Sequence, residues 1–268
     1  MALTDKLTAI GNAIREKEGS TGLIPLSDMP SRIQALSTGG GDDDPVRQSV
    51  LAVANETADV NYVIPAGTRK ISEYMFYHRT NIKAFVYEDE SLITSFGQQA
   101  FDSCSTLTSI KFPSGFTGTE IPYACFQYCS KLSLVEGMPN CVKAINPYSF
   151  AHCFDLQMTT LPESVEGIYQ SAFYNSFSRY SDNPPELFTI PAKVKAVGLE
   201  AFYGVGLKKI RFLGTPDNID NQAFSNSTIT DIYVPWASDF TNGMTAKAPW
   251  GATNAQIHYN VSPDEVIT

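Results

Sequence analysis

A phenylalanine that recurs along most of the chain constrains the fold more than any other feature. The copies are 22 to 29 residues apart, and a bulky apolar residue stands five positions before each one. The residue directly before each copy is small in every repeat except the first. This period predicts a solenoid, because one short unit cannot bury its apolar face without stacked neighbours. The phenylalanines are Phe76, Phe101, Phe126, Phe150, Phe173, Phe202 and Phe224, and the residues five positions earlier are Ile71, Phe96, Ile121, Ile145, Ile168, Val197 and Ile219.

A second pattern, apolar-x-apolar and often followed by proline, keeps the same period. Such alternation predicts short strands with one buried face, which proline ends because it has no N–H to donate. We expect these strands to form a parallel ladder on one side of the stack, while the phenylalanine segments fill the interior. Weaker copies lie at Thr159-x-Leu161 and through Met138-Pro139, and Ile257-x-Tyr259 is expected to be an eighth strand. Clear copies begin at Tyr62, Phe85, Ile110, Phe188, Ile210 and Ile232.

These units resemble the BspA-type leucine-rich repeat, in which I-x-x-x-A-F-x-x-C-x-x-L is followed by I-x-I-P. The stretches from Ile145 to Pro162 and from Phe96 to Pro113 follow the pattern most closely. The resemblance covers about residues 58–260 and implies a leucine-rich-repeat solenoid of about seven repeats plus a capping strand. For function, the resemblance implies adhesion and recognition roles, which are of many kinds among such repeats. The chain departs from the pattern in its fourth strand and in a longer unit between Phe173 and Phe202.

The first 38 residues have a helical rather than a strand pattern. Leu3, Leu7, Ile10 and Ile14 lie on one helical stripe, and a second short helix is expected to begin near Ser27. Two such short helices need something to pack on. The expected organisation is a helical docking or oligomerisation segment (1–38), a Gly/Asp linker (39–48), a repeat solenoid with a C-terminal cap (49–260) and a tail (261–268).

Both ends of the chain resemble proteins of phage tails. The segment from Leu7 to Leu36 looks like a leader of tail and baseplate-associated proteins of phages that infect Gram-positive bacteria, and the ending from Ile232 to Asn254 is similar to closing segments in the same setting. The resemblance implies that residues 1–38 contact other tail or baseplate proteins or sister copies; a homotrimer would fit by analogy with three-fold tail appendages. From the residues themselves, Trp236 and Trp250 are expected to cover the open end of the solenoid.

Composition limits the classes of partner. Hydrophobic residues make up 43% of the 268 residues and the formal net charge is −9, which is typical of a globular chain and unfavourable for binding nucleic acid. No apolar run approaches the roughly 20 residues of a membrane span. The first 20 residues lack the apolar core of a signal peptide. This agrees with the assembly in the host cytoplasm and the place in the virion that the phage-tail resemblance implies.

Residues with catalytic or metal-binding chemistry do not form a convincing site. Cys104, Cys129 and Cys153 each follow a repeat phenylalanine by three positions, which predicts a buried ladder of free thiols. The acidic run Glu88-Asp89-Glu90 follows a strand end, where a solvated turn is favoured over the facing carboxylates of a glycoside hydrolase. We therefore expect a non-enzymatic protein without a cofactor or metal.

The candidate ligand-binding residues are aromatic. Exposed tyrosines offer flat apolar area with a polar tip, which suits a sugar or a protein, although the same rings could merely pad turns. The expected function is host-surface recognition of a glycan or protein by a tail-associated protein. A bacterial surface adhesin, a tail-borne glycan hydrolase and a purely structural baseplate component remain alternatives. The candidates are Tyr77, Tyr174 and Tyr203 one position after the repeat phenylalanine, His78, Tyr128 and His152 two positions after it, and Phe177, Arg179 and Tyr180 in the longer unit.

Overall fold

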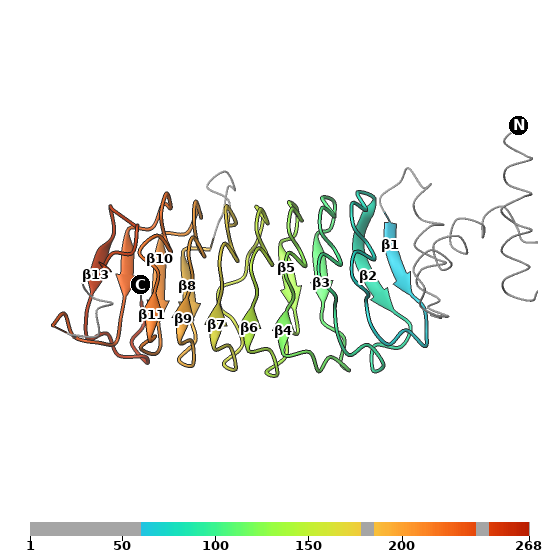
Figure 1. Cartoon of the computed structure of the whole chain (residues 1–268), viewed down its shortest axis with the longest axis horizontal. Coiled ribbons are helices and arrows are strands. Elements are labelled where there is room, and N and C mark those ends of the chain that lie inside the picture. Colours follow the sequence, from blue (N-terminus) through green and yellow to red (C-terminus); the bar gives the residue numbers. More distant parts are fainter. Residues whose placement is uncertain (1–59, 178–184, 240–246, 268) are drawn as a thin grey trace, which may run out of the picture.

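The computed structural model describes residues 60–177, 185–239 and 247–267. Here the chain winds into one elongated solenoid whose coils stack along the long axis, with β1 and β13 at opposite ends (Figure 1). The regular elements in these ranges are all strands, and no described helix is long and apolar enough to cross a membrane. The helices expected within residues 1–38 and the linker at 39–48 lie outside the described residues. We number the coils one to seven by their repeat phenylalanines, from Phe76 to Phe224.

The predicted apolar-x-apolar strands pair in parallel on one side of the solenoid, and we call this set the long ladder. The expected eighth strand, around Ile257, is confirmed. The fourth strand lies around Val135 rather than at Met138-Pro139, and the weak copy after Thr159 forms only a single bridge from Thr160 to Thr189. The long ladder comprises β1 (Val60–Ile64), β2 (Ile82–Tyr87), β3 (Ser109–Lys111), β5 (Leu134–Glu136), β8 (Leu187–Ile190), β10 (Lys209–Phe212), β12 (Asp231–Tyr233) and β13 (Gln256–His258).

A second set of strands, the short ladder, runs beside the long ladder. Its strands contain two residues each, and they pair in parallel through the apolar position five residues before the repeat phenylalanine. The sequence pattern did not predict this second ladder. Two residues are too few to show a strand's alternation, so the sequence reveals the buried position but not its pairing. The short ladder comprises β4 (Glu120–Ile121), β6 (Ala144–Ile145), β7 (Gly167–Ile168), β9 (Ala196–Val197) and β11 (Asn218–Ile219), and an Ile71–Phe96 bridge extends it.

The third side of each coil is an arc, defined as the seven residues from four before the repeat phenylalanine to two after it. In the second arc, the N–H groups of Gln99, Phe101 and Ser103 donate to carbonyl oxygens of the next coil at 3.0, 2.9 and 2.7 Å. Gln99 and Ser103 have φ angles of 50° and 62°. This left-handed geometry turns their N–H groups toward the next coil, so the arc bonds to its neighbour without a strand or a helix.

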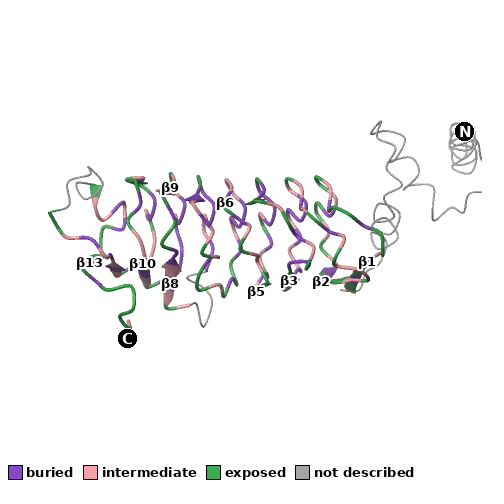
Figure 2. Ribbon diagram, turned by 90° about the horizontal axis from the view of Figure 1, so that it is seen from below, coloured by how far each residue is buried: buried purple, intermediate pink, exposed green. Residues whose placement is uncertain are grey.

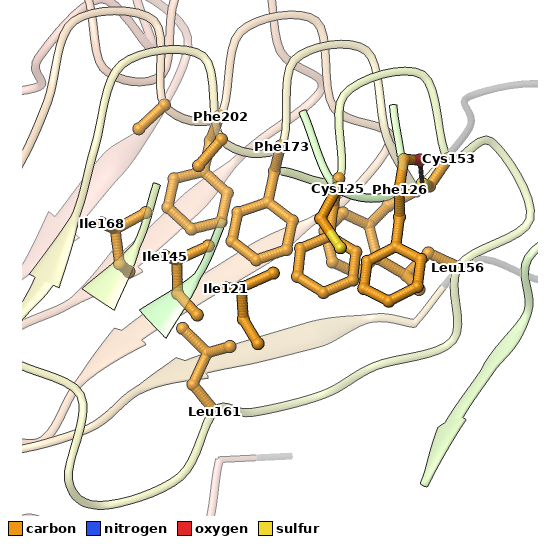
Figure 3. Close-up of a cluster of buried hydrophobic side chains, with 14 of the residues drawn as sticks. Ile121, Cys125, Phe126, Ile145, Cys153, Leu156, Leu161, Ile168, Phe173 and Phe202 are labelled. Carbon is orange, nitrogen blue, oxygen red and sulfur yellow. Dashed lines mark hydrogen bonds between the residues drawn. The ribbon is translucent and has the colours of Figure 1, made fainter. Parts of the chain in front are cut away.

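The repeat phenylalanines stack in a buried column through the interior. The rings of Phe101 and Phe126 are 5.1 Å apart and inclined by 1°, and those of Phe150 and Phe173 are 5.4 Å apart and inclined by 4°. Figure 3 shows part of this column beside the row formed by the apolar residues of the short ladder. Buried stretches recur along the whole length of the solenoid (Figure 2). The core is therefore one continuous row of equivalent positions, as the repeat period predicted.

Trp250 ends the phenylalanine column. Its carbonyl accepts the N–H of Phe224 at 2.9 Å, and its indole lies edge-on to the Phe224 ring at 73°. Trp236 contacts the Trp250 ring, and both indoles are buried. This arrangement agrees with the expectation that the two tryptophans cover the open end of the core.

Three cysteines form the expected buried ladder. The thiols of Cys104, Cys129 and Cys153 each donate to the carbonyl of the repeat phenylalanine in the preceding coil, at 3.0, 3.1 and 3.1 Å. Ser176 makes the equivalent bond in the fifth coil. Each of these side chains therefore gives a hydrogen bond to a buried main-chain carbonyl. Cys125 is also fully buried, whereas Cys141 is partly exposed.

We expect one of the five cysteines, Cys141, to react with a thiol reagent in the native protein at about pH 8. Burial raises the pKa of Cys104 to about 12 and also raises the pKa of Cys125, Cys129 and Cys153, so these thiols stay protonated and covered. Ellman titration should give one equivalent without denaturant and five in guanidinium chloride. A C141S variant should lose the native reaction, and a second fast equivalent would contradict the buried ladder.

Candidate functional site on the arc face

Four predicted aromatic residues lie in one row on the outer surface of the arcs in coils three to six. Tyr128 stacks on His152 with ring centres 4.5 Å apart and an 8° inclination. Tyr174 stacks on Tyr203 at 4.7 Å and 5°. The rings of His152 and Tyr174 are 5.5 Å apart and join the two pairs. Residues from two different sequence columns therefore form one continuous row, because neighbouring arcs lie in contact.

Two further tyrosines, which the repeat columns did not single out, extend this row. The ring of Tyr123, 42% exposed, lies edge-on to Tyr148 at 5.8 Å. Tyr148 is also close enough to Tyr174 to affect its pKa. Tyr123 and Tyr148 stand three and two positions before their phenylalanines, so no single column contains both. The usable signal was the concentration of tyrosine around successive phenylalanines. We define the aromatic patch as Tyr123, Tyr128, Tyr148, His152, Tyr174 and Tyr203.

The pKa values of two residues in the aromatic patch, Tyr174 and His152, are shifted toward the uncharged form. Burial, followed by the proximity of Tyr203 and Glu200, raises the pKa of Tyr174, so its phenol stays protonated. Burial lowers the pKa of His152 from its usual value, which favours the neutral imidazole. The patch therefore presents neutral hydrogen-bonding groups on aromatic rings.

Several rings of the patch stand on left-handed backbone. The φ angles of Tyr128, Tyr148 and His152 are 57°, 60° and 62°. Asn175 and Gly204 occupy the position equivalent to Tyr128 and His152 in coils five and six, and these residue types adopt positive φ more readily than tyrosine does. The same positive φ recurs in the second arc, at Gln99 and Ser103, so the left-handed backbone belongs to the arc and does not explain why tyrosine stands here.

The predicted residues of the first coil form a separate cluster. The rings of Tyr77 and His78 are 4.5 Å apart, and Tyr74 contacts Tyr77 at 5.9 Å. The second arc separates this cluster from the aromatic patch because its phenylalanine is buried and its other side chains are not aromatic. There, the carboxylate of Asp102 is buried and accepts bonds from the side chains of Gln99 and Ser103.

The expectation that Phe177 contacts a ligand is wrong. Its side chain is fully buried, with ring centres 5.6 Å from Phe173 and 5.5 Å from Phe188. In coils two to four, a leucine six positions after the repeat phenylalanine is buried, whereas coil five has Arg179 at that position. Phe177 supplies the missing apolar side chain. Arg179 and Tyr180 lie outside the described residues.

Each carboxylate of the acidic run after β2 has a hydrogen-bond or ion-pair partner of its own. Glu88 accepts the N–H of Ala66 at 2.7 Å, and Asp89 accepts the N–H and O–H of Ser91. Glu90 is 2.9 Å from the Lys111 ammonium. The run borders a hollow of about 550 Å³, and its hydrogen bonds are those of turn residues.

The last histidine lies on the long ladder, away from the arcs. Nε2 of His258 is 2.8 Å from Oδ1 of Asp231, and its ring stacks on Tyr233 at 4.5 Å. The hydrogen bond from His258 lowers the pKa of Asp231. Across the described ranges, no three His, Cys, Asp or Glu side chains are grouped as they would be around a metal ion.

Several solved structures are similar to parts of this chain. A leucine-rich repeat protein from Bacteroides ovatus is 29% identical over 53% of this chain and 35% of its own, with a TM-score of 0.43. The T. pallidum leucine-rich repeat protein is 19% identical over 75% of this chain and 69% of its own, with a TM-score of 0.39. A leucine-rich cell surface protein from Faecalibacterium prausnitzii is 16% identical over 81% and 85%, also with a TM-score of 0.39. No curated protein sequence matches significantly.

A family profile identifies the repeats directly. The profile described as BspA type leucine-rich repeat region matches residues 55–180 and 179–243, with six copies. The matched range covers well over half of the chain, and it contains the phenylalanine column, the short ladder, the long ladder from β1 to β12 and the aromatic patch. The chain therefore belongs to the BspA-type leucine-rich repeat family.

Proposed function

We propose that this protein is a non-enzymatic recognition protein that binds a bacterial cell surface through the aromatic patch. The observation that carries the proposal is the continuous row of rings across four coils. Tyrosine is enriched where proteins recognise ligands, because its ring gives contact area at low entropic cost and its hydroxyl makes a directional hydrogen bond. Padding of turns accounts less well for Tyr128, since asparagine or glycine occupies its left-handed position in coils five and six and the arc does not require an aromatic ring there.

The proposed setting is a phage tail. Its support is the resemblance of the segment from Leu7 to Leu36 to a tail and baseplate leader, and of the segment from Ile232 to Asn254 to closing segments in that setting. In this setting, residues 1–38 contact tail proteins or sister copies while the solenoid faces the host. The repeat family favours a second setting, a bacterial surface adhesin, because BspA-type repeats have adhesion and recognition roles. Both settings use the same face of the solenoid.

Binding of the full-length protein to intact Gram-positive cells tests the proposal. Saturable binding should weaken by about tenfold or more in a Y174A variant and in a Y203A variant, because each loses a ring of the patch. Leu134→Ala is the matched control, since Leu134 is an exposed apolar residue on the long ladder. Binding that is absent from all strains tested, or that responds equally to the control, would overturn the recognition role in favour of a structural one.

A further inference from the structure

The seven arcs form a surface without basic side chains. None of them contains a lysine or an arginine, although the chain has 19 such residues. Their acidic residues are Glu73, Asp102, Glu200 and Asp220. Recognition of phosphate or carboxylate groups relies on arginine and lysine. An anionic polymer on this face would therefore lack a cationic partner and would be repelled by the carboxylates.

Several basic residues lie on or beside the two ladders instead, whereas Arg79 and Lys131 follow the first and third arcs. Lys143 and Lys195 flank Glu166 near the short ladder, with N–O distances of 3.7 and 3.5 Å. Lys111 and Arg211 belong to the long ladder, where they bond to Glu90 and to carbonyls of the C-terminal tail, respectively. The absence of positive charge is thus a property of the arc face and not of the solenoid as a whole.

The arc face offers neutral hydrogen-bonding groups at a regular spacing. Phenols and the imidazole of the aromatic patch recur with ring centres 4.5 to 5.5 Å apart along the row. Uncharged amides accompany them in the same arcs, at Gln127, Asn146, Gln170 and Asn175. Phenols and amides both donate and accept hydrogen bonds, as sugar hydroxyl groups do. A polymer of repeating sugars would meet equivalent groups on successive coils.

The stacking within the patch determines which ring surfaces a ligand meets. Tyr128 and His152 cover one face of each other, and Tyr174 and Tyr203 do the same. A ligand along the row therefore contacts ring edges and polar tips. Beyond the two ends of the row, the equivalent positions are small, Ser103 next to Tyr128 and Ser225 next to Tyr203. Serine covers less of the outer tyrosine face than an aromatic ring would, so these ends are where a sugar ring would stack.

We propose that the aromatic patch binds an uncharged polysaccharide whose chain runs along the solenoid axis across coils three to six. The proposal rests on the recognition function above and names its ligand class. Contiguous rings with centres 4.5 to 5.5 Å apart match a periodic neutral chain better than the irregular surface of a folded protein. The same face selects against anionic wall polymers such as teichoic acids.

Competition for cell binding by the full-length protein tests the ligand class. The soluble competitors are dextran, mannan and β-glucan as neutral polymers, and lipoteichoic acid and hyaluronan as anionic polymers. At least one neutral polymer should displace the protein from cells and bind it directly in calorimetry, with affinity that changes little between low and high salt. Y174A and Y203A should weaken that direct binding by about tenfold, while L134A should not. Thermal unfolding of each variant confirms that it is folded.

The outcomes separate the ligand class from the recognition function. Patch-dependent cell binding that only the anionic polymers displace would overturn the neutral polysaccharide and keep the recognition function. Patch-dependent binding that disappears when the cells are treated with protease, and that no soluble polysaccharide displaces, would identify a protein receptor. This result would also overturn the neutral polysaccharide as the ligand. Cell binding that is as strong in the patch variants as in the wild type would overturn both proposals. Neutral-polymer displacement that requires the patch supports both.

Discussion

Replacing Phe126 by alanine should lower the free energy of unfolding by about 3–5 kcal/mol and the melting temperature by roughly 10 °C. The ring is fully buried and stacks on two neighbours, Phe101 at 5.1 Å and Phe150 at 5.3 Å. Its removal leaves a cavity and weakens the interfaces on both sides of the third coil. Because a solenoid is held by nearest-neighbour interfaces, we also expect the single unfolding transition to broaden or to split into two.

Calorimetry and urea denaturation measure this effect. Phe154→Ala is the control, because Phe154 is a phenylalanine of the next coil that is 39% exposed, and its loss should change stability by no more than about 0.5 kcal/mol. If F126A and F154A were equally stable, the stacked column would not be the main source of cohesion between the coils.

Removing the indole of Trp250 should destabilise the last coil by a comparable amount, about 3–5 kcal/mol, while the earlier coils remain folded. The indole is fully buried and contacts Phe212, Phe224 and Trp236. A W250A variant would expose the end of the phenylalanine column to water. The loss is local because, among the described residues, Trp250 has a neighbouring coil on one side only.

The fluorescence of Trp236 reports this change, since the chain has two tryptophans. In W250A, the emission of Trp236 should shift to longer wavelength at a lower urea concentration than the circular dichroism changes. Trp250→Phe is the matched variant because it keeps an aromatic ring against Phe224. In this variant, the urea concentration at which the Trp236 emission shifts should be closer to the wild-type value. A W250A protein whose Trp236 emission follows the global transition would contradict an end cap with local stability.

The parts of the fold that depend on side-chain period were predictable from the sequence. A buried phenylalanine must recur at each coil for the column to continue, so its spacing gave the coil length and the buried thiols three positions later. The short ladder was not predictable, because main-chain pairing over two residues leaves no alternation to detect. The fourth strand lay around Val135 because cross-strand pairing with Ile110 sets the register, and the nearby Met138-Pro139 only looked similar.

The candidate site was predictable in its chemistry but not in its composition. Equivalent columns correctly pointed to Tyr128, His152, Tyr174 and Tyr203 as neighbours in space. Tyr148 was missed because contact between arcs joins residues from different columns. The longer unit suggested exposure for Phe177, yet burial of its ring compensates for the absence of a leucine two positions later. The length of an insertion alone does not show which of its residues are buried.

The arc-to-arc hydrogen bonds also determine how the molecule responds to a pulling force. They point from each coil to the next, as the bonds of the two ladders do, so they run along the axis that joins β1 to β13. Tension between these ends would load every interface between coils in series, so the weakest interface would open first and the coils would separate one after another. Tension across the coils would instead load many bonds together in shear. A ligand bound along several arcs would bridge adjacent coils and so raise the force needed to separate them.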